Sequence, residues 1–142
     1  MPNLTPLLAK LLATSHTTIY KLSGGKLGDR LVGMPVLFLT TTGRRSGEPR
    51  TTPLTYLEDG DDLVIVASYG GEEKHPAWYL NLTADPAVGV ERHGLTEARG
   101  ARTATAEERA VLWPRAVAAY SGYAGYQRRT AREIPMVILE RR

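Results

Sequence analysis

The sequence predicts an α+β domain built on a small antiparallel β-barrel with flanking helices. Two observations predict this fold. About six short runs of β-branched and apolar residues follow one another from residue 36 onward, and polar or glycine-containing turns separate several of them. Helical patterns lie at the ends and around the middle of these runs, so we expect helices that flank one barrel.

The composition is that of one globular domain. The chain has 142 residues, of which 42% are hydrophobic and 23% charged, enough for a single domain over residues 1–142 with one core. Cysteine is absent, which excludes disulfides, thiolate–metal sites and cysteine nucleophiles and fits a reducing compartment. We find no pattern of a signal peptide or membrane span, so we expect a cytoplasmic protein.

The charge pattern favours a compact anionic ligand. The net charge is only +3, and the basic residues gather in one short loop and near the C-terminus. Nucleic-acid binders more often spread basic residues along a face and interleave them with aromatic residues. We therefore expect no nucleic-acid partner.

Residues 1–25 predict an N-terminal helix, at about residues 4–22, because leucines recur at helical spacing and Gly24-Gly25 supplies a stop. Two interpretations stay open. The helix packs on the barrel core of residues 35–142, or it is an amphipathic segment that touches a membrane or covers a site entrance.

Three strands are expected next. Residues 36–41 read as a buried strand, and residues 50–57 as its neighbour after a basic loop. The Asp-Gly turn at residues 58–62 then leads into a third strand, residues 63–68, which predicts a hairpin.

A short helix should follow at residues 76–84, with Pro76 in its first turn. Residues 87–92 and 96–104 predict a second hairpin, joined at a His-Gly turn.

Thr105 and Glu108 have the spacing of a capping box, so a longer helix should begin there and run toward Tyr120. Pro114 should kink or divide it, because proline cannot donate the helical hydrogen bond. A tyrosine-rich loop and a last strand at residues 134–140 complete the pattern.

The segment "LTTTGRRSGEPRTTPLTY", residues 39–56, is the first candidate site. Arg44, Arg45 and Arg50 lie within seven residues, with Ser46 between them, and arginine binds phosphate through a planar fork of donors. The loop lacks the Gly-Lys-Ser/Thr ending and following helix of a nucleotide phosphate loop. A hairpin with solvated arginines explains the spacing equally well.

The second candidate is "KHPAWYLNL", residues 74–82. Lys74 and His75 precede a helix N-terminus, which favours anions, and Asn81 is the odd polar residue. A capped helix packed through its aromatic residues is the simpler interpretation.

The third candidate is "YSGYAGYQRRT", in which Tyr120, Tyr123 and Tyr126 recur every three residues. Three phenols could stack on a planar ligand or donate protons. Half-buried tyrosines on a helical turn are an equal alternative. Hydrolase, zinc-protease and dinucleotide-binding motifs are absent, and the three histidines lack ligand-like spacing, so we expect no metal site.

Together, "LTTTGRRSGEPRTTPLTYLEDGDDLVIVAS", "GG…KHPAWYLNL", "DP", "ATAEERAVLWP" and "Y…Y…Y…IP" resemble the deazaflavin-dependent nitroreductases, which use coenzyme F420. The similarity runs from about residue 18 to 139. That family has a split β-barrel related to FMN-binding oxidases, so the resemblance implies this fold and an F420H2-dependent oxidoreductase.

The resemblance also implies the site. The basic loop would grip the phosphate and carboxylates of the cofactor tail, the strands after it would line the ring, the 74–81 turn would close round it, and the three tyrosines would roof the substrate side. The implied cofactor-binding residues are Arg44, Arg45, Ser46, Arg50, Pro53, Leu54, Tyr56, Ala67, Ser68, Tyr69, Lys74, Pro76, Ala77, Trp78 and Asn81.

Hydride would pass from the reduced ring to a small-molecule acceptor: a quinone, a nitroaromatic or an activated C=C bond. Tyr123 is the first choice among the three tyrosines to supply the proton. Tyr69 departs from the family, where this position is often smaller or basic, so it could narrow the pocket or replace a charge near the ring.

Two alternatives stay open. One is an FMN-dependent oxidase or reductase on the same fold, because a basic loop serves either phosphate. The other is a carrier that binds the cofactor without turnover. The chain is expected to be a monomer or a homodimer.

Overall fold

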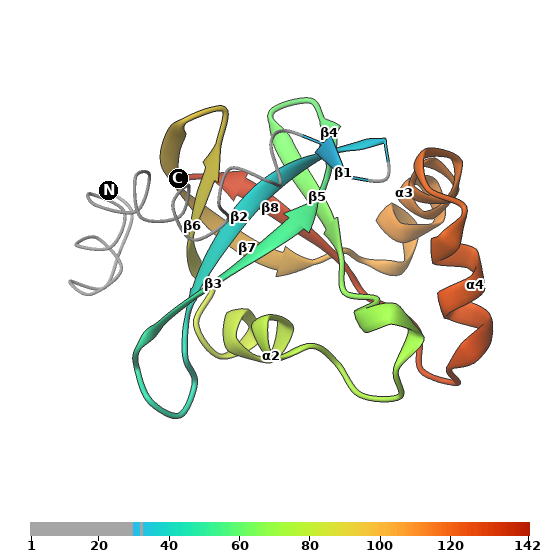
Figure 1. Cartoon of the computed structure of the whole chain (residues 1–142), viewed down its shortest axis with the longest axis horizontal. Coiled ribbons are helices and arrows are strands. Elements are labelled where there is room, and N and C mark those ends of the chain that lie inside the picture. Colours follow the sequence, from blue (N-terminus) through green and yellow to red (C-terminus); the bar gives the residue numbers. More distant parts are fainter. Residues whose placement is uncertain (1–29, 32) are drawn as a thin grey trace.

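The computed structural model describes residues 30–31 and 33–142, so the expected N-terminal helix at residues 4–22 lies outside the described residues. The described part contains strands and helices in an α+β arrangement (Figure 1). In chain order the elements are β1 Arg30–Leu31, β2 Met34–Thr42, β3 Pro49–Thr55, β4 Leu57–Asp59, β5 Asp62–Val66, the short 3-10 turn η1 Tyr69–Gly71, α2 Ala77–Ala84, β6 Ala87–Arg92, β7 Leu95–Thr103, α3 Ala106–Ala119, α4 Gly122–Arg129 and β8 Met136–Arg141.

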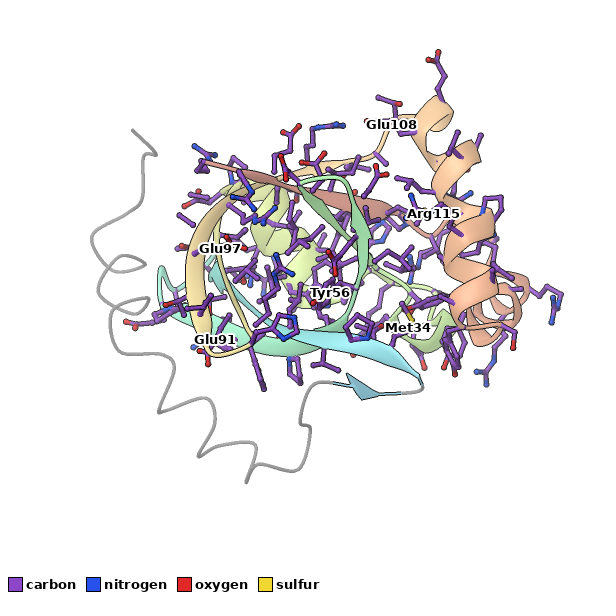
Figure 2. The ribbon with its side chains drawn as sticks, turned by 90° about the horizontal axis from the view of Figure 1, so that it is seen from above. Met34, Tyr56, Glu91, Glu97, Glu108 and Arg115 are labelled. Atoms are coloured by element: carbon purple, nitrogen blue, oxygen red, sulfur yellow. The ribbon has the colours of Figure 1, made fainter. Side chains whose placement is uncertain are left out.

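The strands form one antiparallel sheet that curls into a barrel. Its order is β1-β2-β6-β7-β8-β5-β4, and β3 pairs with β2 outside this path. Seen end-on, the strands surround an interior filled by side chains, with Tyr56 among them (Figure 2). The predicted hairpins at the Asp-Gly and His-Gly turns are confirmed as β4–β5 and β6–β7.

The barrel closes through a segment that changes its pairing partner at Tyr56. Before Tyr56, β3 pairs with β2, with Thr55 opposite Val36; after it, β4 pairs with β5, with Leu57 opposite Val64. The single predicted strand at residues 50–57 is therefore divided. Tyr56 itself is only 1% exposed, and its N–H donates to the carbonyl of Pro35 at 3.1 Å.

Two apolar clusters lie on the two faces of the sheet. One fills the barrel and receives Trp78 and Leu82 from α2. The other lies between the sheet and α3 and α4, where Leu112, Ala116 and Tyr123 pack. Strand β5 contributes to both clusters, which explains its unbroken apolar sequence.

The helices depart from the prediction in two places. The capping box of Thr105 and Glu108 is confirmed, but α3 is not divided at Pro114 and continues to Ala119, with Leu112 and Ala116 packed on the sheet. The prediction of a tyrosine-rich loop is wrong, because residues 122–129 form α4, which is anchored by buried Tyr123. None of the helices in the described part of the chain has the length and apolar character to cross a bilayer.

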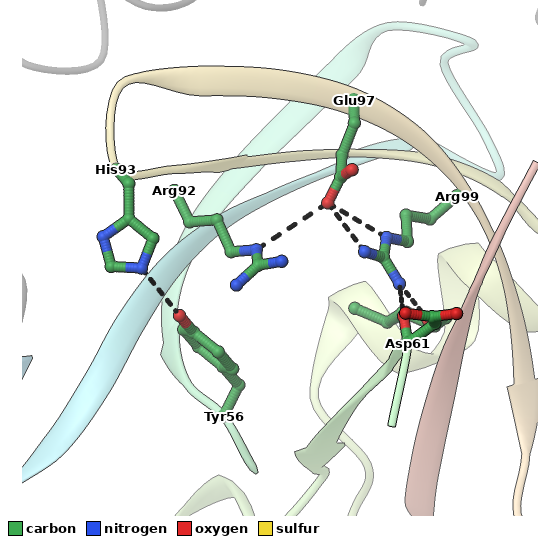
Figure 3. Close-up of polar contacts among 7 residues, drawn as sticks. Tyr56, Asp61, Arg92, His93, Glu97 and Arg99 are labelled. Atoms are coloured by element: carbon green, nitrogen blue, oxygen red, sulfur yellow. Dashed lines mark hydrogen bonds and ion pairs between the residues drawn. The ribbon is translucent and has the colours of Figure 1, made fainter. Parts of the chain in front are cut away.

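A buried arginine ties three segments of the barrel together (Figure 3). Arg99 is fully buried on β7, and its Nη1 donates to the carbonyls of Asp61 at 2.7 Å and Leu139 at 2.9 Å. Its Nε and Nη2 donate to Glu97 Oε1 at 3.1 and 2.9 Å. One guanidinium thus connects β7, β8 and the β4–β5 turn.

We predict that Arg99→Ala lowers the free energy of unfolding by about 3 kcal/mol or more, because it removes the guanidinium donor from the carbonyls of Asp61 and Leu139 and leaves a cavity in the barrel. Urea unfolding measures this loss. The matched control is Arg102→Ala on the same strand, which removes a partly exposed arginine paired with Glu108 and Glu140. This variant should lose much less free energy of unfolding. An equal loss in both variants would contradict the role of Arg99 in tying the barrel segments together.

Candidate functional site

Two adjoining pockets lie where β3, the segment after β5, α2 and α4 meet. The first, the apolar pocket, has a volume of about 570 Å³ and the second, the basic pocket, about 380 Å³. Both are lined by Thr52, Ala77 and Trp78, so they are two parts of one groove. The apolar pocket is also lined by Pro53, Leu54, Thr55, Val66, Ser68, Tyr69, Gly70, Pro76, Tyr120, Tyr123 and Tyr126; the basic pocket by Gly43, Arg44, Arg45, Ser46, Arg50, Thr51 and Asn81.

The apolar pocket lies along the split of the barrel. In the described chain, β3 pairs along its length with β2 only, and its other edge faces the groove. Pro53 is tolerated on such an edge because no ladder bond is needed there. The change of partner at Tyr56 thereby opens the space that Thr52, Leu54 and Thr55 line.

The basic loop, residues 43–48, is folded tightly at the tip of the β2–β3 hairpin. Gly43 N–H donates to Glu48 O at 2.7 Å, and Gly47 N–H donates to Gly43 O at 2.8 Å. A side chain at Gly43 would clash with Ser46 Oγ at 2.7 Å. The loop is therefore compact, and it leaves Arg44 and Arg45, together with Arg50 at the start of β3, exposed to a ligand.

Asn81 of α2 holds this loop in place. Its side chain is 4% exposed, and its Oδ1 accepts bonds from Arg44 N at 3.1 Å and Arg44 Nη1 at 3.2 Å. Its Nδ2 donates to Thr41 Oγ1 at 3.2 Å. Asn81 lines the basic pocket, yet its polar atoms bind the protein, which orients Arg44 toward the groove.

The three tyrosines all line the apolar pocket, from the end of α3 and from α4. Tyr123 is 5% exposed, and its hydroxyl lies 2.8 Å from Thr55 Oγ1 and 3.9 Å from Met34 Sδ. The hydroxyls of Tyr120 and Tyr126 lie 3.0 Å apart. The rings pack edge to face, with centroids of Tyr120 and Tyr123 separated by 5.2 Å.

The surroundings of Tyr123 and Tyr126 keep these two phenols protonated. Burial raises the pKa of Tyr123, and the hydrogen bond with Tyr120, followed by burial, raises the pKa of Tyr126. Both hydroxyls are therefore hydrogen-bond donors at neutral pH.

The wall loop, residues 67–75, borders the apolar pocket through Ser68, Tyr69 and Gly70. Tyr69, Gly70 and Gly71 have φ values of +48°, +64° and +83°. Only glycine fits at Gly71, because a Cβ there would lie 2.8 Å from Tyr126 O. The wall loop therefore lies directly against α4, and Tyr69, 49% exposed, stands at the pocket rim.

Three residues expected at the site lie away from both pockets. Tyr56 points into the barrel, where its hydroxyl is 3.5 Å from His93 Nε2 (Figure 3). Ala67 is fully buried and donates its N–H to Pro135 O. Lys74 lines a third hollow with Glu72, Glu73 and Arg129, which adjoins the apolar pocket at Gly70.

Sequence reasoning missed Thr52, Thr55 and Val66 of the pocket wall and Arg132 behind it. The alternation of a strand could have indicated Thr52 and Thr55, which flank the expected Pro53 and Leu54. Arg132 carries no sequence signal, because an arginine in a polar segment usually reads as a solvated charge.

His75, the last residue of the wall loop, contacts Arg132. Arg132 Nη1 lies 3.1 Å from His75 Nδ1, and because a guanidinium can only donate, Nδ1 is the unprotonated acceptor. Burial and the charge of Arg132 lower the pKa of His75. The contact therefore requires a neutral imidazole.

Comparisons of this chain with known proteins agree on one family. The model of the family described as F420H(2)-dependent quinone reductase matches residues 12–141. The F420H(2)-dependent quinone reductase Rv1261c of Mycobacterium tuberculosis is 43% identical over 133 residues, which cover 89% of this chain and 88% of that protein.

Two solved structures are similar along most of the described chain. An F420-H2 dependent reductase, FDR-A, has 44% identity and a TM-score of 0.69, covering 75% of this chain and 94% of the other. A structure described as a domain-swapped dimer has 36% identity and a TM-score of 0.69, covering 87% and 98%. The haem storage protein HutZ of Vibrio cholerae, at 10% identity, TM-score 0.57 and coverage of 86% and 88%, shares the fold alone.

We predict that His75 makes the protein less stable in mild acid. Because the folded pKa of His75 lies below the ordinary value of 6.5, the unfolded chain takes up the proton first, so stability falls as the pH drops below about 6.5. Replacing His75 by Asn keeps an acceptor near the Nδ1 position and removes this effect. Thermal melts at about pH 7.5 and about pH 5.5 measure it.

The control is His93→Asn, which removes a histidine at the β6–β7 turn, where φ is +52° and asparagine is tolerated. It should retain the wild-type loss of melting temperature between the two pH values. If the melting temperature of His75→Asn falls between the two pH values as much as that of the wild type, His75 does not cause the acid destabilisation.

Proposed function

This chain belongs to the F420H(2)-dependent quinone reductase family, and from that membership we propose that its groove holds reduced coenzyme F420 and a quinone. It is an oxidoreductase, and its cofactor is coenzyme F420. The observation that supports this assignment of the groove is the direct continuity of an apolar pocket with an arginine-lined one. A planar ring joined to an anionic tail needs this combination.

The basic pocket suits the cofactor tail. Arg44 and Arg45 of the basic loop and Arg50 at the start of β3 are exposed, so their guanidinium groups are available for charge-assisted bonds to phosphate and carboxylates. Asn81 fixes the direction of Arg44 before any ligand arrives. Three exposed arginines around one hairpin tip fit an extended anionic tail better than the single phosphate of FMN.

The apolar pocket suits the ring and the acceptor. The edge of β3, with Pro53 and Leu54, and the start of α2, with Ala77 and Trp78, form apolar surfaces for a planar group. The bound cofactor supplies the hydride, and the protein need only hold donor and acceptor together and keep water out.

Tyr123 is the proposed proton donor to the reduced quinone. Reduction by hydride leaves an anionic oxygen, which needs a proton to give the hydroquinone. If Thr55 donates its hydroxyl hydrogen to Tyr123, the phenol hydrogen is held only by the weak acceptor Met34 Sδ and can turn toward the quinone oxygen. Thr55 would then orient the donor, and the Tyr120–Tyr126 pair would supply a second hydrogen bond.

The small-molecule acceptor is part of the family assignment. Contact of residues 4–22 with a membrane, where a lipid-soluble quinone would be met, stays a prediction, as does the cytoplasmic location. One related structure is described as a domain-swapped dimer, so we include a homodimer in the proposal.

The first experiment is a fluorescence titration with oxidised coenzyme F420, with FMN in parallel. We expect F420 to bind and FMN to bind more weakly. In Arg44→Ala/Arg45→Ala the F420 affinity should fall about ten- to hundredfold, about 1.5–3 kcal/mol, since charge-assisted bonds at an exposed loop are lost.

The control Arg141→Ala/Arg142→Ala removes the same charge from the end of β8 and should leave the affinity unchanged. If the Arg44/Arg45 variant binds F420 as tightly as the wild type, this loop does not bind the cofactor tail. A preference for FMN would move the protein to the flavin oxidase alternative, and tight F420 binding without turnover by any quinone would favour the carrier.

A second test concerns the proton. Tyr123→Phe should lower kcat for quinone reduction by about a hundredfold while the F420 affinity stays the same, and Thr55→Val should lower it in the same direction. Tyr79→Phe is the control, because its hydroxyl bonds Thr103 on the exposed side of α2. Unchanged turnover in Tyr123→Phe would exclude this residue as the donor.

A further inference from the structure

Arg132 makes most of the arginine hydrogen bonds that hold the wall loop of the apolar pocket, and Arg129 adds one to Gly70 O at 3.3 Å. Arg132 lies between α4 and β8, and its guanidinium spans the loop from its start to its end. Nη1 donates to Ala67 O at 3.2 Å, Nη2 to Ser68 O at 2.8 Å and Nε to Glu72 O at 2.9 Å. The fourth contact is that of Nη1 with His75 Nδ1, directly before α2.

The wall loop needs such support. Three successive residues have positive φ, and for Tyr69 this conformation is unfavourable. Within the loop, two backbone bonds, from Gly71 N to Ser68 O and from Glu72 N to Tyr69 O, form the turn η1. The carbonyls of Ala67, Ser68 and Glu72 all point to one side, and the planar fork of arginine matches several acceptors at once.

The backbone of Arg132 is itself fixed to the tyrosine-bearing helix α4. Gln127 Nε2 donates to Arg132 O at 2.8 Å, and Gln127 Oε1 accepts from Ile134 N at 2.9 Å. Arg109 of α3 donates to the same Oε1 at 3.1 Å. A continuous set of hydrogen bonds therefore runs from α3 and α4 through Arg132 to the opposite wall of the pocket.

We propose that Arg132 is a positioning residue that sets the distance between the wall loop and α4, and with it the width of the apolar pocket. It does not line the pocket, so it acts through Ser68, Tyr69 and Gly70, which do. The close contact of Gly71 with Tyr126 shows that this distance has little slack. The expected effect on cofactor binding rests on the proposed function; the expected effect on the loop does not.

Hydrogen–deuterium exchange of the full chain tests the loop directly. In Arg132→Ala, amides of residues 67–75 should exchange at least about tenfold faster, while those of β7 should not change. Arg132→Lys keeps the charge but cannot span the four acceptors, so it should show most of the same increase. Arg128→Ala, which removes an exposed guanidinium from the last turn of α4, is the control and should match the wild type.

Binding and kinetics test the consequence. Arg132→Ala should bind F420 about tenfold more weakly, or reduce quinone with a kcat about tenfold lower, and millimolar free guanidinium should restore part of the loss in this variant only. Such rescue separates a local positioning role from a general loss of stability.

Unchanged exchange of residues 67–75 in Arg132→Ala would overturn the inference, and so would faster exchange throughout the domain. Wild-type behaviour of Arg132→Lys would overturn the role of the planar fork. If the wild-type protein fails to bind F420, the proposed function fails, but the exchange experiment still decides whether Arg132 positions the loop.

Discussion

The architecture of the groove depends on one constraint, the change of pairing partner at Tyr56. The segment from Pro49 to Asp59 hydrogen-bonds to β2 through its first part and to β5 through its second. A strand paired with β2 alone would leave the barrel open. A strand paired with both β2 and β5 along its whole length would close the barrel completely. Because the partner changes midway, the barrel closes at one end, and the other end keeps a free edge beside a groove.

The buried side chain of Tyr56 makes this arrangement stable. It fills the barrel at the point where the ladder is interrupted, and its N–H is satisfied by Pro35 O, so the change of partner leaves that buried donor paired. Arg99 supports the same closure by tying the β4–β5 turn to β7 and β8. The groove can remain open because the remainder of the barrel is tied together by this core.

The sequence was sufficient for the features that depend on neighbours in the chain. The Asp-Gly and His-Gly hairpins, the capping box of α3 and the clustering of arginines are local, and the resemblance added the family and most of the pocket lining. The change of partner at Tyr56 and the reach of Arg132 depend on residues far apart in the chain, so no local pattern indicated them. Helix α4 has weak intrinsic propensity, with two glycines and two β-favouring tyrosines among its eight residues, and it forms because Tyr123 is buried against the sheet.

The two halves of the groove differ in charge, one basic and one neutral, and the proposed chemistry needs this difference. Exposed arginines suit a tail that stays charged, and their attraction is not offset by a large desolvation cost. In the proposed function the hydride-transfer side is the apolar pocket, which is lined by neutral groups. Charge would appear there only when the acceptor is reduced, in surroundings of low polarity where one donor hydrogen bond counts most. Burial raises the pKa of Tyr123, so the proposed donor would keep its proton until then. An arginine in that position would favour the anionic acceptor as well, but it could not give up a proton, whereas a phenol can do both.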